Sequence, residues 1–255
     1  MTGAATGIGR SIAVALARAG AHIAVNHFGR ATDARQLVKE MAPHGANAIE
    51  VEADVTKAAK VERMINKVRD ALGPIDILVN NAAVILEKPF LETTEEDWDF
   101  VLDTDLKAVF LCSRAVLPGM IERGTGVVIN IASELGFLGR ERYGPYCAAK
   151  AGVIGLTRAM AREFAPAIRV NAIAPRPDQH TNAVDRTHEC GNAGARTRHS
   201  RPPRRRAVGD CGYGIVPGIR PGEFLLRAGA ESEWWGVDGM NEAVTVVKTN
   251  AMEFQ

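Results

Sequence analysis

The glycine-rich stretch at residues 3–9 constrains the fold more than any other part of the sequence. Gly3, Gly7 and Gly9 stand at a spacing that permits a tight turn, close approach of the backbone to a phosphate group, and close packing of the following helix. The free N–H groups and the dipole at the start of such a helix favour a bound anion. Because a glycine-rich turn alone is more often only a turn, its interpretation depends on the rest of the chain.

Apolar runs that are typical of buried parallel strands alternate with helical patterns over residues 1–175. Strands are predicted at 21–25, 48–53, 75–79, 127–133 and 168–173. Helices are predicted at 8–19, 32–41 and 55–72, after a capping box at 93–96, and from 146 to 164. This alternation predicts an α/β fold, a Rossmann-like doubly wound parallel sheet with helices on both faces.

Tyr146 and Lys150 stand four residues apart, so a helix places them one turn apart on the same face. A neighbouring ammonium lowers the pKa of a phenol, which lets the Tyr exchange protons with a substrate oxygen. Ser133 closes the apolar run 127–133 at the carboxyl end of a predicted strand, where side chains line the ligand crevice. On its own, such a pair is more often a packed Tyr and a solvated Lys.

Taken together, these motifs resemble the classical short-chain dehydrogenase/reductase family, in its 3-oxoacyl-reductase-like or sugar-dehydrogenase-like branch. The motifs are Thr2-Gly3-Ala4-Ala5-Thr6-Gly7-Ile8-Gly9, Asn80-Asn81-Ala82, Ser133, Tyr146 and Lys150, and the resemblance covers Thr2 to Pro175. It implies hydride transfer between a nicotinamide cofactor and a carbonyl or secondary alcohol. In this family pattern Tyr146 is the acid/base, Ser133 steadies the substrate oxygen, and Lys150 lowers the pKa of Tyr146 and holds the nicotinamide ribose.

The resemblance also implies a cofactor site along the carboxyl ends of the strands. The residues that it assigns to the cofactor are Gly3, Thr6, Gly7, Ile8, Gly9, Asn26, Arg30, Asp54, Val55, Asn81, Ala82, Tyr146, Lys150 and Pro175. An acidic residue after the second strand would repel a 2′-phosphate, but Asn26 to Arg30 contain no carboxylate and end in an Arg. This favours NADP(H) over NAD(H), although many NADP-dependent relatives carry a basic residue where Thr6 stands. The alternatives are a solvated Arg30, and for Asp54 a helix cap.

Asp105 departs from the family pattern, in which the fourth catalytic residue is an Asn. Helical spacing predicts Asp105 on the same inward face as Trp98, Val101 and Leu102. A buried carboxylate is costly unless it is paired or hydrogen-bonded, so Asp105 either pairs with Lys150 or breaks the proton relay that the Asn supports. A catalytically impaired nucleotide-binding remnant is therefore the second hypothesis for the function.

Both ends of the sequence depart from the family pattern. The residues before Gly3 leave room for little of the first strand, which lies in the middle of the family's sheet, so this strand is expected to be truncated and its neighbours left with unpaired backbone groups. Residues 1–175 are interpreted as an NAD(P)-binding catalytic domain. Residues 176–255 are interpreted as a divergent tail, disordered or shifted in reading frame, in which 234–236 and 244–247 are too isolated to assign to a sheet. A chain that does not fold alone is the third hypothesis.

The charge balance of 31 basic and 30 acidic residues indicates no general attraction to nucleic acid or membrane. The Arg-Pro-rich run at 201–206 has few aromatic neighbours, so nucleic-acid binding is not predicted. The Cys and His residues fit no metal-site spacing, and no metal is expected. The absence of a leader and of an apolar run near 18 residues predicts a cytoplasmic protein, with no membrane span. By resemblance, and through small residues along the Tyr146 helix, a homo-oligomer (a dimer or tetramer) is expected.

Overall fold

The computed structural model describes residues 1–175 continuously and, beyond them, only the backbone of three short strands at 226–227, 234–235 and 244–247. The helices are α1 Gly7–Arg18, α2 Ala31–Met41, α3 Ala58–Leu72, α4 Glu95–Leu102, α5 Ala108–Arg123, α6 Leu135–Leu138 and α7 Gly144–Phe164. The strands are β1 Ile23–His27, β2 Ala48–Glu52, β3 Ile77–Asn80, β4 Gly126–Ile131, β5 Ile168–Pro175, β6 Leu226–Arg227, β7 Trp234–Trp235 and β8 Val244–Val247. The predicted α/β fold is confirmed.

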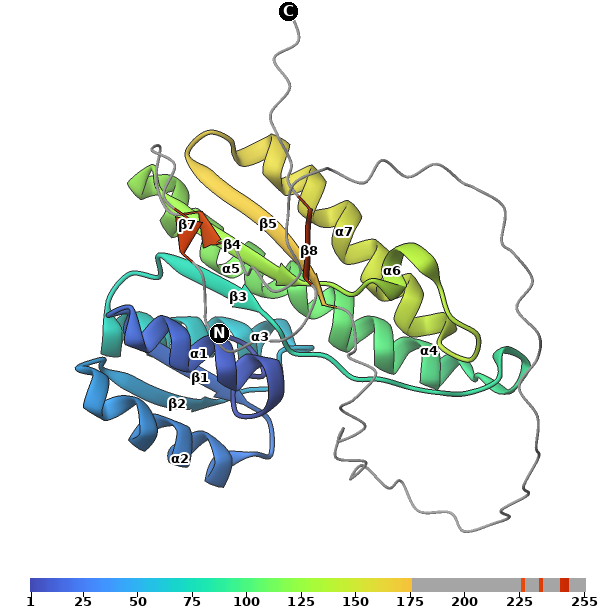
Figure 1. Ribbon diagram of the computed structural model, residues 1–255, viewed down its shortest axis with the longest axis horizontal. Coiled ribbons are helices and arrows are strands. Elements are labelled where there is room, and N and C mark those ends of the chain that lie inside the picture. The colour runs from blue at the N-terminus through green and yellow to red at the C-terminus, as the bar shows by residue number, and fades with distance from the viewer. Residues whose placement is uncertain (176–225, 228–233, 236–243, 248–255) are drawn as a thin grey trace, which may run out of the picture.

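The strands form two parallel ladders, one of β1 with β2 and one in the order β3–β4–β5 (Figure 1). The prediction that 234–236 and 244–247 cannot be assigned to a sheet is wrong for two short segments. β8 pairs antiparallel with the end of β5, and β7 pairs with β6. The β5–β8 pairing joins segments far apart in sequence, and the β6–β7 pairing involves only two residues on each strand. Neither leaves a local pattern in the sequence. The predicted disorder, the frame shift and the Arg-Pro-rich run lie outside the described residues.

Helices cover both faces of the sheet (Figure 1). On one face, side chains of α3, α5 and α7 pack against Leu78, Val128 and Val170 to form the largest apolar cluster. On the other face, Ile12 of α1 packs against Val79, and α1 and α2 enclose the inner side chains of β1. The sheet is therefore doubly wound, as its element order predicts.

The helix boundaries follow from local signals, with one shift of register. The capping box was predicted at 93–96, but Thr94 is the N-cap of α4, and its hydroxyl accepts the backbone N–H of Asp97. The Asp97 carboxylate in turn accepts the Thr94 N–H. Asp serves as well as Glu at this position, so the box moved by one residue. The helix α3 likewise ends at a local signal, because Gly73, which follows it, adopts a φ of 85°.

Met1 and Thr2 lie between β1 and β3 and form hydrogen bonds with both strands. The Thr2 N–H donates to the Val79 carbonyl at 3.0 Å, and the Met1 carbonyl accepts the Asn26 N–H at 3.1 Å. The Met1 amine donates to the Ala24 carbonyl at 3.0 Å. These bonds continue the strand pattern on both sides and bridge β1 and β3, which do not pair with each other directly.

Two negative observations apply to the part of the chain that the structure describes. None of its helices combines the length and the hydrophobicity that crossing a membrane requires. None of its groups of His, Cys, Asp and Glu side chains is arranged to hold a metal ion.

Candidate active site

Ser133, Tyr146 and Lys150 converge at the carboxyl end of β4. Ser133 lies two residues beyond that strand, and the first two turns of α7 carry Tyr146 and Lys150. All three side chains are buried, and Lys150 is only 2% exposed. The Ser133 hydroxyl is hydrogen-bonded to the Tyr146 phenol, and the Lys150 Nζ lies 5.5 Å from the centre of the Tyr146 ring. The structure thus brings together the three side chains that the sequence motifs grouped.

Asp105 pairs with Lys150. The Asp105 Oδ2 lies 3.3 Å from the Lys150 Nζ, and the Asp105 Oδ1 accepts the Val84 N–H at 2.8 Å. Lys150 also donates to the Ile131 carbonyl at 3.1 Å. Burial raises the pKa of Asp105 above its ordinary value, and the charge of Lys150 opposes that rise. Of the two arrangements left open by the sequence, the structure has the ion pair.

The segment that carries Asp105 is a π turn, Asp103–Lys107, between α4 and α5. The sequence predicted one uniform helix with Trp98 and Asp105 on its inner face. A π turn changes the helical register, and Trp98 is 39% exposed whereas Asp105 is fully buried. The prediction that Trp98 faces inward is therefore wrong, and the one for Asp105 agrees with the structure.

The pKa of Tyr146 shifts in the direction opposite to the predicted one. Burial raises the pKa of Tyr146 to about 12, against which the hydrogen bond with Ser133 acts, and the Asp105 carboxylate adds to the rise. The expected depression by Lys150 fails because Asp105 offsets the ammonium charge and burial disfavours the phenolate. The phenol therefore stays protonated through the neutral range.

The glycine-rich turn has the geometry that a phosphate cradle requires. Gly3 and Gly7 both have a φ of 56°, which favours glycine. A Cβ at Gly9 would lie 2.5 Å from the Gly3 oxygen, so only glycine allows α1 to pack this closely. A Cβ at Gly7 would meet no atom within 4 Å, and the N-cap residue Thr6 is exposed and makes no side-chain cap. The first N–H groups of α1 are thus open to an anion.

Thr2 is a positioning residue that the predicted site omitted. Its Oγ1 accepts the Asn81 N–H at 2.9 Å and the Ala82 N–H at 3.1 Å. The Asn81 side chain returns two bonds, donating to the carbonyls of Thr2 and Gly3 at 3.1 and 2.9 Å. The only hint of this role in the sequence is the position of Thr2 directly before Gly3. This network ties the glycine turn to the end of β3, beside Ala82.

Asn26 and Arg30 occupy different surroundings at the end of β1. Asn26 is 4% exposed, and its amide donates to the carbonyls of Val51 and Ala53 while its Oδ1 accepts the Gly3 N–H. Its side chain is therefore committed to bridging the sheet. Arg30 has a side chain that is 39% exposed and lies 3.6 Å from Asp33, within reach of a ligand at the surface.

The remaining predicted cofactor residues lie along the same edge of the sheet. Asp54 accepts the backbone N–H and the hydroxyl of Thr56 at 2.9 and 2.7 Å, and α3 begins only at Ala58 after the N-cap Lys57. The alternative of a helix cap at Asp54 is thus wrong. The other members are Val55, which is buried, Ile8, which is partly buried in α1, and Pro175, the last residue of β5.

A polar network runs beneath the site. The Asn80 amide donates to the Asn130 Oδ1 at 2.8 Å, and the Asn130 amide donates to the Thr157 Oγ1 at 2.9 Å. All three side chains are at least 97% buried. The network joins β3, β4 and α7, and its signal in the sequence is an Asn inside the apolar run of β4.

Comparisons with known proteins agree with this arrangement. A profile of the short chain dehydrogenase family matches residues 1–189. The 3-oxoacyl-[acyl-carrier-protein] reductase FabG of Staphylococcus epidermidis (strain RP62A) is 43% identical over 69% of this chain and 72% of its own. The 3-oxoacyl-[acyl-carrier-protein] reductase of Synechocystis sp. (strain PCC 6803) is 42% identical over 69% of this chain and 71% of its own.

Among solved structures, a variant of actinorhodin polyketide ketoreductase crystallised with NADPH matches with a TM-score of 0.65 and 38% identity. The match covers 67% of this chain and 66% of that one. Profile, sequence and structure thus agree over the region that carries the glycine turn and the buried Ser, Tyr and Lys. The chain belongs to the short-chain dehydrogenase family of oxidoreductases, which act on CH–OH and C=O groups.

Proposed function

We propose that the chain is an NADP(H)-dependent reductase of ketones, with Tyr146 as the proton donor. The observation that carries the proposal is the convergence of Ser133, Tyr146 and Lys150 in a buried cluster at the end of β4. The proposed catalytic domain comprises residues 1–175, with residues 176–255 as a divergent tail.

The residues around the glycine turn fit a dinucleotide. The open space at Gly7 and the uncapped start of α1 suit a pyrophosphate. The Arg30 guanidinium, which now pairs with Asp33, could instead pair with a 2′-phosphate. The NADPH named in the ketoreductase structure supports the same preference. When bound, NADP(H) supplies or accepts the hydride. Asn26 holds the strands that frame this region, because its amide is fully used within the fold.

The chain's own groups handle the proton. The Ser133 hydroxyl donates a hydrogen bond to the carbonyl oxygen of the substrate, and the Tyr146 phenol donates its proton to that oxygen as negative charge develops there. Because burial raises the pKa of Tyr146 to about 12, the phenol is in its donor form at neutral pH. Alcohol oxidation needs the phenolate, so reduction is the favoured direction near neutrality. Lys150 remains anchored by Ile131 and Asp105.

The substrate to test first is a 3-oxoacyl thioester, the class that the names of the relatives give. A homo-oligomer, dimer or tetramer, is part of the proposal. Large exposed apolar side chains around α4 and α5 support it, namely Phe90, Leu91, Phe100 and Phe110. Sedimentation velocity tests it, and a monomer at all concentrations would contradict it. A cytoplasmic location stays a prediction of the sequence.

The test is a fluorescence titration of the purified chain with NADPH and with NADH, followed by turnover of a 3-oxoacyl thioester. Saturable binding, tighter for NADPH, and consumption of NADPH are expected. Tyr146→Phe is expected to lower kcat about a hundredfold or more while the Kd for NADPH stays the same. Full activity in this variant would refute the role of Tyr146, and tighter NADH binding would refute the cofactor preference.

A nucleotide-binding remnant without turnover is the second candidate, and the Asp105–Lys150 pair favours it. The ion pair occupies the ammonium that the family pattern assigns to the nicotinamide ribose. Saturable NADPH binding without consumption, across a panel of ketones, would identify this candidate. The third hypothesis, a chain that does not fold alone, is tested by whether the free chain shows a cooperative melt.

A further inference from the structure

The turn that joins β1 to α2 contains Arg30, the residue proposed to bind the 2′-phosphate. His27 is the last residue of β1, Gly29 has a φ of 69°, and Arg30 is the N-cap of α2. The first N–H groups of α2 receive no side-chain cap from Arg30. The turn therefore presents together two features that suit a phosphate, a guanidinium and the open start of a helix.

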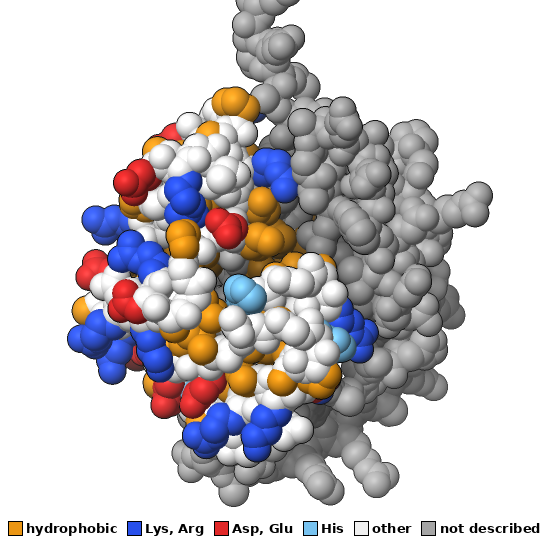
Figure 2. Space-filling view, turned by 90° about the vertical axis from the view of Figure 1, so that its left-hand side faces the viewer, with side chains coloured by type: hydrophobic (Ala, Val, Ile, Leu, Met, Phe, Trp, Pro, Cys, Tyr) orange, Lys and Arg blue, Asp and Glu red, His pale blue; other side chains and the backbone are white. Residues whose placement is uncertain are grey.

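The side chain of Arg30 does not by itself fix the turn. Its guanidinium lies 3.6 Å from the Asp33 carboxylate, and the two side chains are 39% and 44% exposed. Exposed ion pairs of this kind contribute little to stability. Charges of both signs are also frequent on the surface, since Figure 2 shows Lys and Arg side chains interspersed with Asp and Glu over the side that it draws. The position of Arg30 therefore depends on bonds of its backbone.

The backbone N–H of Arg30 donates to the ring nitrogen Nδ1 of His27 at 3.3 Å. In an ordinary four-residue turn, the carbonyl of the first residue accepts this N–H. Here the His27 carbonyl instead accepts the Ala53 N–H at 3.0 Å, which extends the pairing of β1 with β2 beyond Glu52. The imidazole thus takes the place of the occupied carbonyl, so the chain turns directly after the strand.

The tautomer of His27 follows from its two partners. A backbone N–H can only donate, so Nδ1 carries a free lone pair and the proton of the neutral ring is on Nε2. The His27 Nε2 lies 2.6 Å from the Glu50 Oε2, which accepts this proton. The hydrogen bond with His27 lowers the pKa of Glu50, which keeps the carboxylate in its accepting form. Because His27 is only 2% exposed, its ring is shielded from water.

Strand β2 supports the turn at a second point. The Gly29 N–H donates to the Glu52 Oε1 at 3.2 Å. Glu50 and Glu52 stand two residues apart on β2, so their side chains lie on the same face of the strand. One of these carboxylates therefore holds the turn directly, and the other holds it through the ring of His27.

We propose that His27 is a positioning residue that lets the chain select the 2′-phosphate of NADP(H). Its Nδ1 holds the Arg30 N–H and so fixes the N-cap of α2, from which the guanidinium and the first N–H groups of α2 reach the phosphate. His27 acts from inside the fold, through Arg30. This role rests on the proposed NADP(H) preference and deepens it, because selection then depends on a ring tautomer as well as on the charge of Arg30.

Two substitutions separate the two ring nitrogens. The side-chain oxygen of Asn stands where Nδ1 stands, so His27→Asn keeps the acceptor for the Arg30 N–H and loses the bond to Glu50. The side-chain amide nitrogen of Gln stands where Nε2 stands, so His27→Gln keeps the bond to Glu50 and loses that acceptor. Each variant loses one bond of the same buried ring, so the two are matched.

The probes are adenosine 2′,5′-bisphosphate and adenosine 5′-monophosphate, which differ only in the 2′-phosphate and undergo no hydride transfer. Isothermal titration calorimetry gives the Kd of each. The unaltered chain is expected to prefer the bisphosphate by about tenfold or more. We expect His27→Gln to lower that preference by about tenfold and His27→Asn to keep it within about twofold. A preference retained by His27→Gln, or lost equally by both variants, would overturn the proposal.

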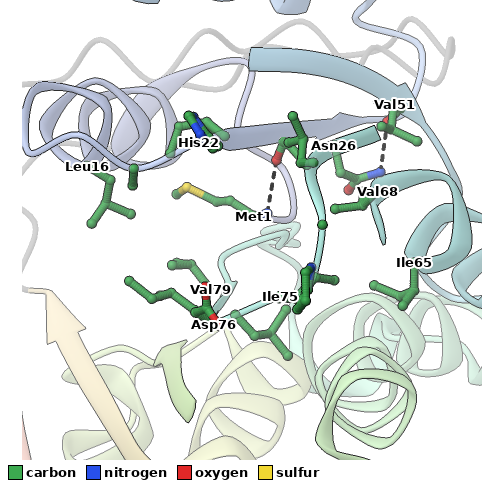
Figure 3. A pocket seen from close by; sticks show the side chains of 18 of the residues that line it. Met1, Leu16, His22, Asn26, Val51, Ile65, Val68, Ile75, Asp76 and Val79 are labelled. Carbon is green, nitrogen blue, oxygen red and sulfur yellow. Dashed lines mark hydrogen bonds between the residues drawn. The ribbon is translucent and has the colours of Figure 1, made fainter. Parts of the chain in front are cut away.

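His22 provides a control of the same chemistry. Its Nδ1 also accepts a backbone N–H, that of Asn47 at 3.0 Å, but directly before the start of β1. Figure 3 shows His22 well away from Asn26 and from the hydrogen bond that Asn26 makes with Val51. His22→Gln is expected to leave the preference for the bisphosphate unchanged. A loss as large as that in His27→Gln would show a general effect of β1 and refute the proposal.

The tautomer is measured on the unaltered chain, which tests the proposal even where a substitution prevents folding. Long-range proton–nitrogen correlation spectra near neutral pH are expected to show His27 with a protonated Nε2 and an unprotonated Nδ1. A protonated Nδ1 would overturn the proposal. An unaltered chain without preference for the bisphosphate would refute the proposed cofactor preference and the role of His27 together. A preference that survives His27→Gln would refute the role of His27 alone.

Discussion

The two halves of the sheet are held together by different means. Strands β3, β4 and β5 pair in a continuous parallel ladder, and the Asn80–Asn130–Thr157 network crosses beneath it. Strands β1 and β2 pair with each other but not with β3, and Met1 and Thr2 bridge the two by backbone hydrogen bonds beside an open slot. Ser133, Tyr146 and Lys150 therefore lie on the continuous half, whereas the glycine turn lies at the junction of the two halves, here called the seam.

The two halves of the sheet would carry different parts of the proposed reaction, proton transfer on one and cofactor binding on the other. In the proposed mechanism, burial and the Asp105–Lys150 pair set the pKa of Tyr146, and these groups lie on β4, α7 and the π turn before α5. The proposed cofactor site includes the turn at Gly3 to Gly9, which hydrogen bonds of Thr2 and Asn81 tie to the end of β3. We therefore expect substitutions at the seam to weaken nucleotide binding, and substitutions in the continuous half to leave it intact.

Thr2→Val is expected to have the largest effect. The change keeps the branched shape but removes the oxygen that accepts the Asn81 and Ala82 N–H groups, which leaves two donors without a partner. A loss of about 3 kcal/mol in the free energy of unfolding is expected, with weaker NADPH binding. Denaturant unfolding and fluorescence titration measure the two effects.

Thr157→Val is the matched control on the continuous half. It removes the oxygen that accepts the Asn130 amide, in an equally buried position. Comparable destabilisation with unchanged NADPH affinity is expected. If both variants weakened NADPH binding equally, the distinction between seam and continuous half would be wrong.

Gly9→Ala comes next in size. Its Cβ would lie 2.5 Å from the Gly3 oxygen and 2.6 Å from the Asn81 Nδ2, so α1 must move away from the turn. A cost of about 2 to 3 kcal/mol is expected, together with loss of NADPH binding. Gly155→Ala in α7 is the control, since nothing lies within 4 Å of its Cβ, and it is expected to gain up to about 1 kcal/mol. Tight NADPH binding by the first variant would show that the close packing at Gly9 is dispensable.

Much of the fold, and the convergence of Ser133, Tyr146 and Lys150, could be predicted because the signals are local. The apolar run that ends at Ser133 and the four-residue spacing of Tyr146 and Lys150 fix a strand end and a helix face, and both follow from sequence period alone. The tight turn at residues 3–9 could also be predicted, since Gly3 and Gly7 adopt conformations that favour glycine.

What could not be predicted depends on contacts between distant segments. The sequence assigned Asn26 to the cofactor site but gave no sign that its amide donates to the carbonyls of Val51 and Ala53 while its Oδ1 accepts the Gly3 N–H. The pKa of Tyr146 depends on burial and on Asp105, which lies on another helix, and the spacing to Lys150 reveals neither. The π turn that carries Asp105 is likewise invisible to a search for a 3.6-residue period.

The Met1 amine makes the seam sensitive to pH. Burial lowers the pKa of this amine from 8.0 to about 6 in the folded chain, so between these values the unfolded chain binds more protons. Stability is therefore expected to fall as the pH drops from about 8.5 to about 6, by about 2 kcal/mol. Denaturant unfolding of the free chain and of the Nα-acetylated chain at both pH values isolates this group. Equal pH dependence in the two forms would contradict burial of the amine.

Asp105→Asn has the smallest expected effect and acts on the continuous half. The amide still accepts the Val84 N–H, but the negative charge that adds to the pKa of Tyr146 is gone, and Lys150 regains its influence on the phenol. The pKa of Tyr146 is therefore expected to fall by up to about one unit, so alcohol oxidation at a fixed neutral pH is expected to quicken by up to about tenfold. Spectrophotometric titration of the phenol without cofactor, against the Tyr146→Phe chain, gives an independent measure. Asp103→Asn, on an exposed pair with Lys107, is the control and is expected to leave the titration unchanged. Burial is the larger cause of the raised pKa of Tyr146. If the pKa returned to the ordinary value of a free Tyr, Asp105 rather than burial would be the main cause. If the titration did not change, Asp105 would have no part in the proton chemistry.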